Sequence, residues 1–229
     1  MERQAKDSLI ERFDAALDVI GTALRNCPDE QWGASLWWVD PRDLWVNDMW
    51  FWARDHDVSF WKTNWPAAAV AGARAMREGA DVSTALVAMA AASGATLPEG
   101  VEPPPLQDEA AIQAISALWR VAFHALFHCD MRLSDPNEPF APPPPFTPED
   151  EDYGPRVLER EDLLAYVAHC RRKSAQTIGD LTPDRAQTVG HWNTTFERAL
   201  EINVAHLEEH GAQVEREVAK WRRPSLPTV

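Results

Sequence analysis

One segment, residues 108–133, constrains the fold most, because apolar side chains cover nearly its whole circumference when it is drawn as a helix. Only Gln113, Ser116 and Arg120 give this helix a narrow polar stripe. A helix with so little polar surface is stable only where other helices surround it. The segment therefore predicts a central helix in a helical bundle.

Three further long helices are predicted from apolar residues that recur at helical spacing, over residues 8–24, 160–181 and 194–221. Two shorter helices are expected over residues 66–78 and 82–93, where glycine and aspartate mark the ends. No segment has the alternating pattern of a β-strand, and no internal repeat is found. The pattern predicts an all-α protein.

A proline-rich segment, residues 134–155, separates the second long helix from the third. It contains eight prolines, which exclude a regular helix and a central strand. Its length suits a connection that runs along a bundle. We therefore predict a four-helix bundle with a long crossover between helices 2 and 3.

Tryptophan is concentrated between the first and second long helices. Eight of the eleven tryptophans lie in this region: Trp32, Trp37, Trp38, Trp45, Trp50, Trp52, Trp61 and Trp65. We expect an irregular segment that large aromatic side chains anchor to the bundle. The alternative is an aromatic wall over a ligand pocket.

Charge and composition limit the partners of the protein. The formal net charge of −14 argues against binding to nucleic acid or to an anionic membrane. No apolar run is long enough to span a bilayer, and residues 1–7 are too polar for a secretory signal. The three cysteines, Cys27, Cys129 and Cys170, lack metal-type spacing and are expected to be buried thiols. We expect a cytoplasmic protein.

Two histidines in the last long helix, His206 and His210, are the strongest candidates for chemistry. They are four residues apart and fall within the apolar stripe of residues 194–221. Imidazoles that face a core cost free energy unless a partner binds them. A divalent metal ion is the simplest partner, and hydrogen bonds to other polar side chains are the alternative.

A metal site in a bundle needs a ligand from a facing helix. The second long helix offers His124 and His128, which are also four residues apart. His124 lies at the edge of the polar stripe, whereas His128 lies more squarely on the apolar side. Periodicity therefore favours His128 slightly and does not choose between the two.

Several motifs resemble the DinB-like metal-binding superfamily. Residues 119–133 resemble the signature of its second helix, and residues 203–213 resemble the signature of its last helix. Further similarity lies in residues 27–37, 140–146 and 163–173. The resemblance implies one bundle domain over residues 1–229. It does not cover residues 47–105, which we interpret as an insertion within that domain.

The resemblance also implies a metal site made of His124, His206 and His210. His128 departs from the family pattern, and it is interpreted as a fourth ligand, a base beside the ion or a core residue. Imidazole suits zinc, nickel and iron(II), of which zinc is expected. Members of the superfamily often dimerise through their helices, so a homodimer is a further expectation.

Three functions are compatible with such a site. The resemblance favours a transferase that uses a low-molecular-weight thiol, with the ion activating the thiolate. A hydrolase that uses metal-bound water, with His128 or Glu209 as base, is the second. A metal-stabilised binding or stress protein is the third.

The acidic residues 40–43 and 149–152 are expected to be solvated loops. The basic residues 171–173 are expected to form a solvated helix face, with binding of a thiol's carboxylate as the alternative.

Overall fold

A computed structural model describes residues 2–56, 58, 64–106, 108–151, 156–190 and 194–221. All regular elements in these residues are helices, so the all-α prediction is confirmed. The chain divides into two compact units, which are considered separately. The main unit comprises Met1–Trp37 and Ala114–Val229, and the inserted unit comprises Trp38–Gln113.

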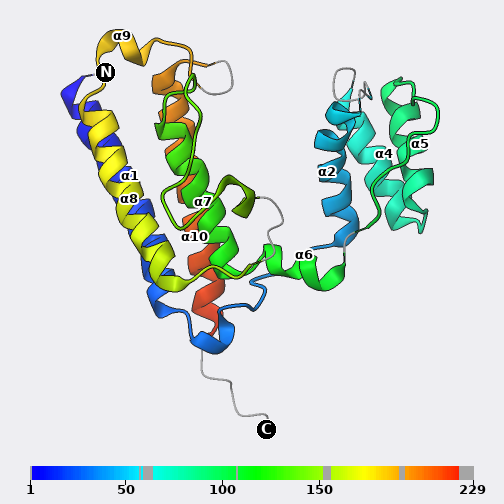
Figure 1. Cartoon of the computed structure of the whole chain (residues 1–229), viewed down its shortest axis with the longest axis horizontal. Coiled ribbons are helices and arrows are strands. Elements are labelled where there is room, and N and C mark those ends of the chain that lie inside the picture. Colours follow the sequence, from blue (N-terminus) through cyan, green and yellow to red (C-terminus); the bar gives the residue numbers. More distant parts are fainter. Residues whose placement is uncertain are drawn as a thin grey trace. The chain divides into compact units, whose positions relative to one another are not determined.

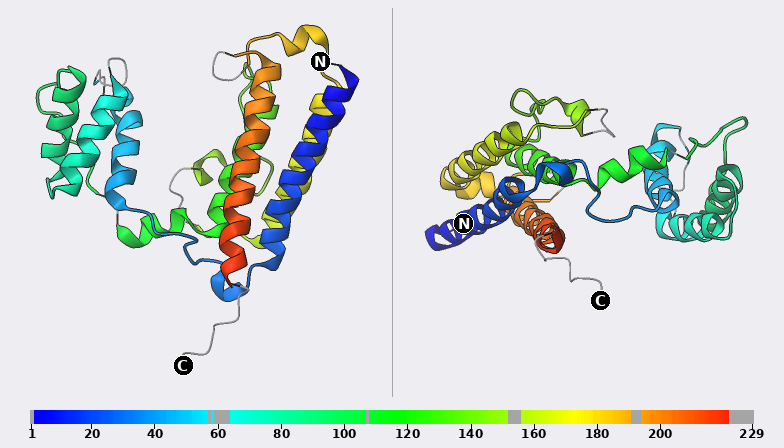
Figure 2. Two further views of the ribbon diagram at one scale, coloured as in Figure 1. Left: turned by 180° about the vertical axis from the view of Figure 1, so that it is seen from behind. Right: turned by 90° about the horizontal axis from the view of Figure 1, so that it is seen from below.

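Four long helices build the main unit: α1 (Arg3–Asn26), α7 (Leu118–Leu133), α8 (Arg160–Gly179) and α10 (Phe196–Trp221). Helix α1 packs against α8 and α10, and α7 packs against the same two helices (Figure 1). The short helix α9 (Pro183–Ala186) lies between α8 and α10 in the sequence. Figure 2 shows the same four helices from behind and from below. Each long helix thus has two principal neighbours around a common interior.

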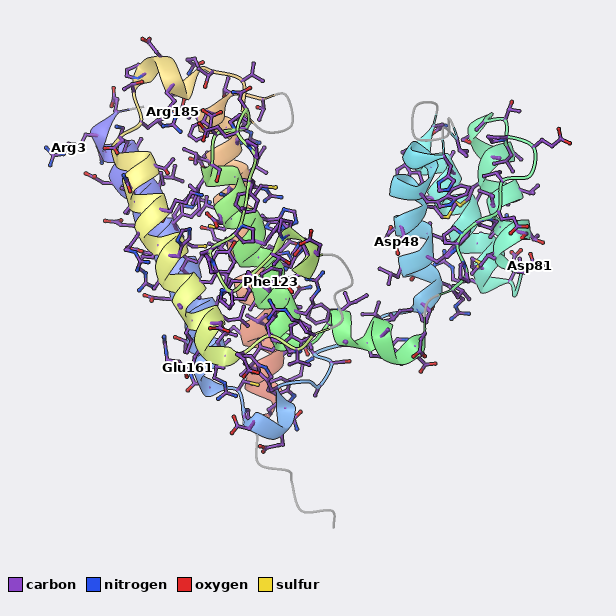
Figure 3. All side chains as sticks on the ribbon, viewed as in Figure 1. Arg3, Asp48, Asp81, Phe123, Glu161 and Arg185 are labelled. Atoms are coloured by element: carbon purple, nitrogen blue, oxygen red, sulfur yellow. The ribbon has the colours of Figure 1, made fainter. Side chains whose placement is uncertain are left out.

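That interior is an apolar core to which all four long helices contribute. Leu17, Phe123, Tyr166 and Leu207 come one from each helix, and none is more than 1% exposed. Side chains fill the space around Phe123 in Figure 3. The proline-rich segment adds Phe146, whose ring lies 5.2 Å from that of Phe123 between centroids. Burial of this aromatic side chain attaches the segment to the core.

The predicted central helix over residues 108–133 proves to be two helices, α6 (Glu109–Ile115) and α7. The backbone leaves the helical path at Ser116, where the carbonyl accepts a hydrogen bond from Leu36 N at 2.9 Å. The Ser116 hydroxyl donates to Trp37 O at 2.7 Å. These bonds to a distant segment replace helical ones, so the prediction of one continuous helix is wrong.

The inserted unit contains α2 (Pro41–Asp55), α4 (Trp65–Arg77) and α5 (Val82–Ser93) around a small core of its own. Helices α4 and α5 are in close contact at Gly72, where an added Cβ would lie 2.8 Å from the side chain of Met89. Only glycine permits this approach without a shift of Met89. The expectation of an irregular segment over residues 32–65 missed α2.

The described tryptophans act mainly as anchors. Trp32 Nε1 donates to Leu158 O at 3.0 Å in the main unit, and Trp45 Nε1 donates to Pro104 O at 2.8 Å in the inserted unit. Trp38 is the exception, with 63% of its surface exposed. Trp61 and the Trp50 side chain lie outside the described residues. An aromatic wall over a pocket stays a prediction.

None of the described helices combines the length and the apolar character that a membrane span requires. All three cysteines are buried free thiols, as the sequence predicts.

Candidate metal centre

The contact between α7 and α10 brings together His124, His206 and His210. One potential ligand atom from each of the three lies within 4.8 Å of those of the other two. The rings of His206 and His210 are 4.5 Å apart between centroids, because residues four apart share one face of α10. The His124 ring lies 5.4 Å from His206 and 5.1 Å from His210.

The contacts of His210 indicate which of its ring nitrogens carries the proton and which carries the lone pair. Its Nδ1 lies 3.0 Å from Gln213 Oε1, which can only accept, so Nδ1 carries the proton. Nε2 of His210 therefore presents a lone pair, 3.2 Å from Nε2 of His206. Nδ1 of His206 is buried and has no hydrogen-bond partner among the described residues. Protein groups alone leave this pair incompletely satisfied, as expected of a site for a cation.

Burial keeps the α10 pair neutral. It lowers the pKa of His206 to about 3, with further lowering by the nearby imidazole of His210 and the guanidinium of Arg132. Burial and the proximity of His124 also lower the pKa of His210. Neutral imidazole is the form that binds a metal ion, so neither ring must lose a proton first.

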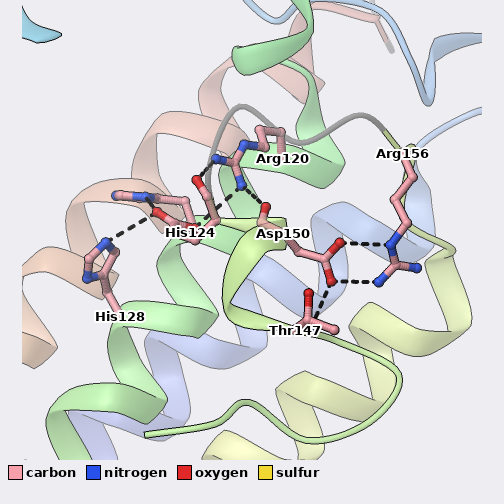
Figure 4. Close-up of polar contacts among 7 residues, drawn as sticks. Arg120, His124, His128, Thr147, Asp150 and Arg156 are labelled. Atoms are coloured by element: carbon pink, nitrogen blue, oxygen red, sulfur yellow. Dashed lines mark hydrogen bonds and ion pairs between the residues drawn. The ribbon is translucent and has the colours of Figure 1, made fainter.

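Glu151, in the proline-rich segment, contacts the two histidines of α7, which are labelled in Figure 4. Its Oε1 lies 2.5 Å from Nδ1 of His124 and 3.3 Å from Nε2 of His128. His124, His128 and Glu151 form a second group of potential ligand atoms, which shares His124 with the first. Burial lowers the pKa of His128 although Glu151 acts to raise it.

Arg120 holds Glu151 in place. It is only 7% exposed, and its guanidinium donates to Asp150 O at 2.6 Å and to the carbonyl of Glu151. Asp150 in turn binds Arg156 at 2.6 Å and the backbone N–H of Thr147 at 2.8 Å. Figure 4 shows these contacts as one continuous network.

The expectation of a solvated acidic loop over residues 149–152 is therefore wrong for Asp150 and Glu151. Burial acts to raise the pKa of Glu151, but hydrogen bonds from His124 and His128 outweigh it and hold that pKa at about 2. Sequence reasoning missed Glu151 because it is 27 residues from His124 in a segment without periodicity. A run of four acidic residues was the only signal.

Neither group of potential ligand atoms includes the remaining candidates among the described residues. Glu209 is exposed. His169 contacts Asp130 at 3.2 Å, and Lys173 contacts the same carboxylate at 2.5 Å. Arg171 pairs with Asp14 at 3.2 Å. His191 lies outside the described residues.

These features define an all-helical protein with a candidate site of histidine and glutamate side chains for a divalent metal ion. Residues 115–214 match the family model of the DinB superfamily, so over this part of the chain the protein is DinB-like. The matched residues include α7, α8 and all four histidines of α7 and α10. Neither a curated protein nor a solved structure matches the chain.

Proposed function

We propose that the protein is a DinB-like enzyme that depends on a divalent metal ion bound by His124, His206 and His210. The proposal includes the DinB-type architecture, with the four long helices as its bundle and residues 134–155 as its crossover. The observation that carries it is the convergence of three imidazoles from two helices, with ligand atoms within 4.8 Å. Zinc is the expected ion, and nickel or iron(II) would suit the same ligands.

The proposed reaction is the transfer of a low-molecular-weight thiol to an electrophilic substrate. Three protein ligands leave a metal position open for a small molecule, as in catalytic sites. The ion, when bound, supplies a positive charge that favours the thiolate over the thiol. A pKa lowered by burial and a contact with Glu151 support His128 as the proposed acceptor of the thiol proton.

A conjugation assay tests this reaction. Metal-loaded protein is mixed with a generic aromatic electrophile and with glutathione, mycothiol or bacillithiol in turn. We expect thiol-dependent product formation that chelation and His210→Ala abolish. A rate no higher than the background reaction with all three thiols would exclude the transferase.

A hydrolase is the second candidate, and the contact between His128 and Glu151 favours it. A histidine hydrogen-bonded to a carboxylate beside a metal ion is suited to accept a proton from water. The His128 ring is 4.4 Å from that of His124 between centroids. Ester hydrolysis without added thiol, lost in His128→Ala, would support this reaction over transfer.

Metal analysis separates the roles of the two α7 histidines. Purified His124→Ala protein is expected to lose the ion, and His128→Ala protein is expected to keep it. Equal loss in both variants would instead indicate a site with four histidines. A protein that binds an ion, is stabilised by it and turns over no substrate would fit a binding or stress protein.

A further inference from the structure

The carboxylate of Glu151 contacts the ring of His124 at one nitrogen. It contacts Nδ1 at 2.5 Å, a distance that fits a strong hydrogen bond between a ring N–H and a carboxylate. A carboxylate at this position makes Nδ1 the donor. Nε2 of His124 is then the nitrogen that carries the lone pair.

The same arrangement occurs on the opposite helix. His210 donates from Nδ1 to Gln213 Oε1 at 3.0 Å, which leaves its Nε2 with the lone pair. One ring from each of the two helices thus has its Nδ1 in contact with an oxygen acceptor. In metal sites, such acceptors select the tautomer of a ligating histidine and hold its ring in one orientation.

The position of Glu151 is set by α7 itself. Arg120 and His124 are four residues apart and therefore lie on one face of that helix. From this face Arg120 binds the carbonyls of Asp150 and Glu151, and its guanidinium lies 3.4 Å from Glu151 Oε2. The bonds from Asp150 to Arg156 and Thr147 hold the preceding turn. The backbone at Glu151 is therefore fixed beside His124.

We propose that Glu151, held by Arg120, is a positioning residue that keeps His124 in the Nδ1–H tautomer and directs its Nε2 to the ion. The inference rests on the proposed metal site. It means that residues 134–155, which contain Glu151, help to orient a ligand of the ion. Arg120, Glu151 and His124 would act in series: the arginine fixes the loop, the loop presents the carboxylate, and the carboxylate orients the ligand.

The first experiment compares ion affinity in three variants. Glu151→Ala removes the acceptor, Glu151→Gln keeps an acceptor oxygen, and Glu149→Ala changes an exposed acid two residues away. Zinc affinity is measured by competition with a chromophoric chelator. We expect Glu151→Ala to weaken binding by about 10–100-fold. Glu151→Gln should lose less, and Glu149→Ala should match the unmodified protein.

A second measurement reports the tautomer directly. Nitrogen-15 spectra of histidine-labelled, metal-free protein should show His124 protonated at Nδ1 in the unmodified chain and in Glu151→Gln. In Glu151→Ala the proton should redistribute toward Nε2. A purely structural effect of the substitution would lower the melting temperature without changing this tautomer ratio.

Three outcomes would overturn the inference. Unchanged affinity in Glu151→Ala would show that the carboxylate is not needed, and tighter binding would show that it competes with the ion. If the unmodified protein binds two ions and Glu151→Ala binds one, Glu151 is itself a ligand of a second ion. If the unmodified protein binds no zinc, the proposed function fails first, so the two failures are distinguishable.

Discussion

At the residue scale, Gln213 offers a test of the site from the α10 side. Its Oε1 accepts from His210 Nδ1 at 3.0 Å, and that bond leaves the lone pair of the ring on Nε2. Gln213→Leu removes the acceptor while keeping a side chain of similar size. We expect zinc affinity to fall about 10-fold, measured by chelator competition.

Two further variants serve as controls for the effect of Gln213→Leu on zinc affinity. Gln213→Glu keeps the acceptor and should preserve or increase the affinity, because a carboxylate makes the ring a stronger base. Glu215→Gln alters an exposed acid two residues from Gln213 and should leave the affinity unchanged. Equal loss in Gln213→Leu and Gln213→Glu would contradict a role for the acceptor.

The site residues differ in how far the sequence could predict them. Helix geometry alone placed His206 and His210 on one face, and they do lie together. Periodicity could not choose between His124 and His128, because both lie where α7, Glu151 and α10 meet. Glu151 was unpredictable, since its position depends on Arg120 binding the backbone of a loop that has no periodic pattern.

At the scale of elements, a buried carboxylate joins α7 to α8. Asp130 is 1% exposed and accepts from Lys173 at 2.5 Å, Tyr166 at 3.1 Å and His169 at 3.2 Å. Asp130→Asn keeps the shape but leaves the ammonium of Lys173 without its charge partner. We expect a loss of about 2 kcal/mol in the free energy of unfolding, measured with urea.

The ion pair of Arg171 with Asp18 provides the matched control, because it joins α8 to α1 near the surface. The two side chains are 41% and 66% exposed. Solvent screens such a pair, so Asp18→Asn should cost less than about 1 kcal/mol. A larger loss in Asp18→Asn than in Asp130→Asn would contradict the assigned importance of the buried network.

We expect the stability of α5 to depend on pH, because Asp81 caps the N-terminus of this helix. Asp81 accepts from Thr84 N at 2.7 Å, and this bond lowers the pKa of its carboxyl below the usual value. The ionised Asp81 carboxylate therefore stabilises α5 fully above the pKa that this carboxyl has in the unfolded chain. The stabilisation is lost as pH falls through the lower pKa of the folded protein. Amide exchange in α5 should accelerate below about pH 4 relative to Asp81→Asn, whose cap does not titrate. Identical pH dependence in both proteins would contradict it.

The elements themselves were largely predictable, since apolar periodicity and prolines are local signals. Helix α5 begins and ends where the sequence indicates, at Val82 and Ser93. The break between α6 and α7 was not predictable, because bonds from Leu36 and to Trp37 produce it. No residue near Ser116 marks these distant partners.

At the scale of the whole molecule, the two units have separate apolar cores. The core of the main unit draws on α1, α7, α8 and α10, whereas that of the inserted unit draws on α2, α4 and α5. All residues proposed to bind or orient the ion belong to the main unit. Binding energy at the site should therefore stabilise one core directly and the other only if the two unfold together.

We expect the ion to protect the main unit alone. A ligand that binds only the folded state adds about 1.4 kcal/mol of stability for each tenfold rise of its free concentration above Kd. Hydrogen exchange followed by mass spectrometry should show slower exchange in peptides from α7 and α10 when zinc is added. Peptides from α4 and α5 should not change, and His210→Ala should abolish the effect. Equal protection of α4 and α5 would show instead that both cores unfold as one cooperative unit.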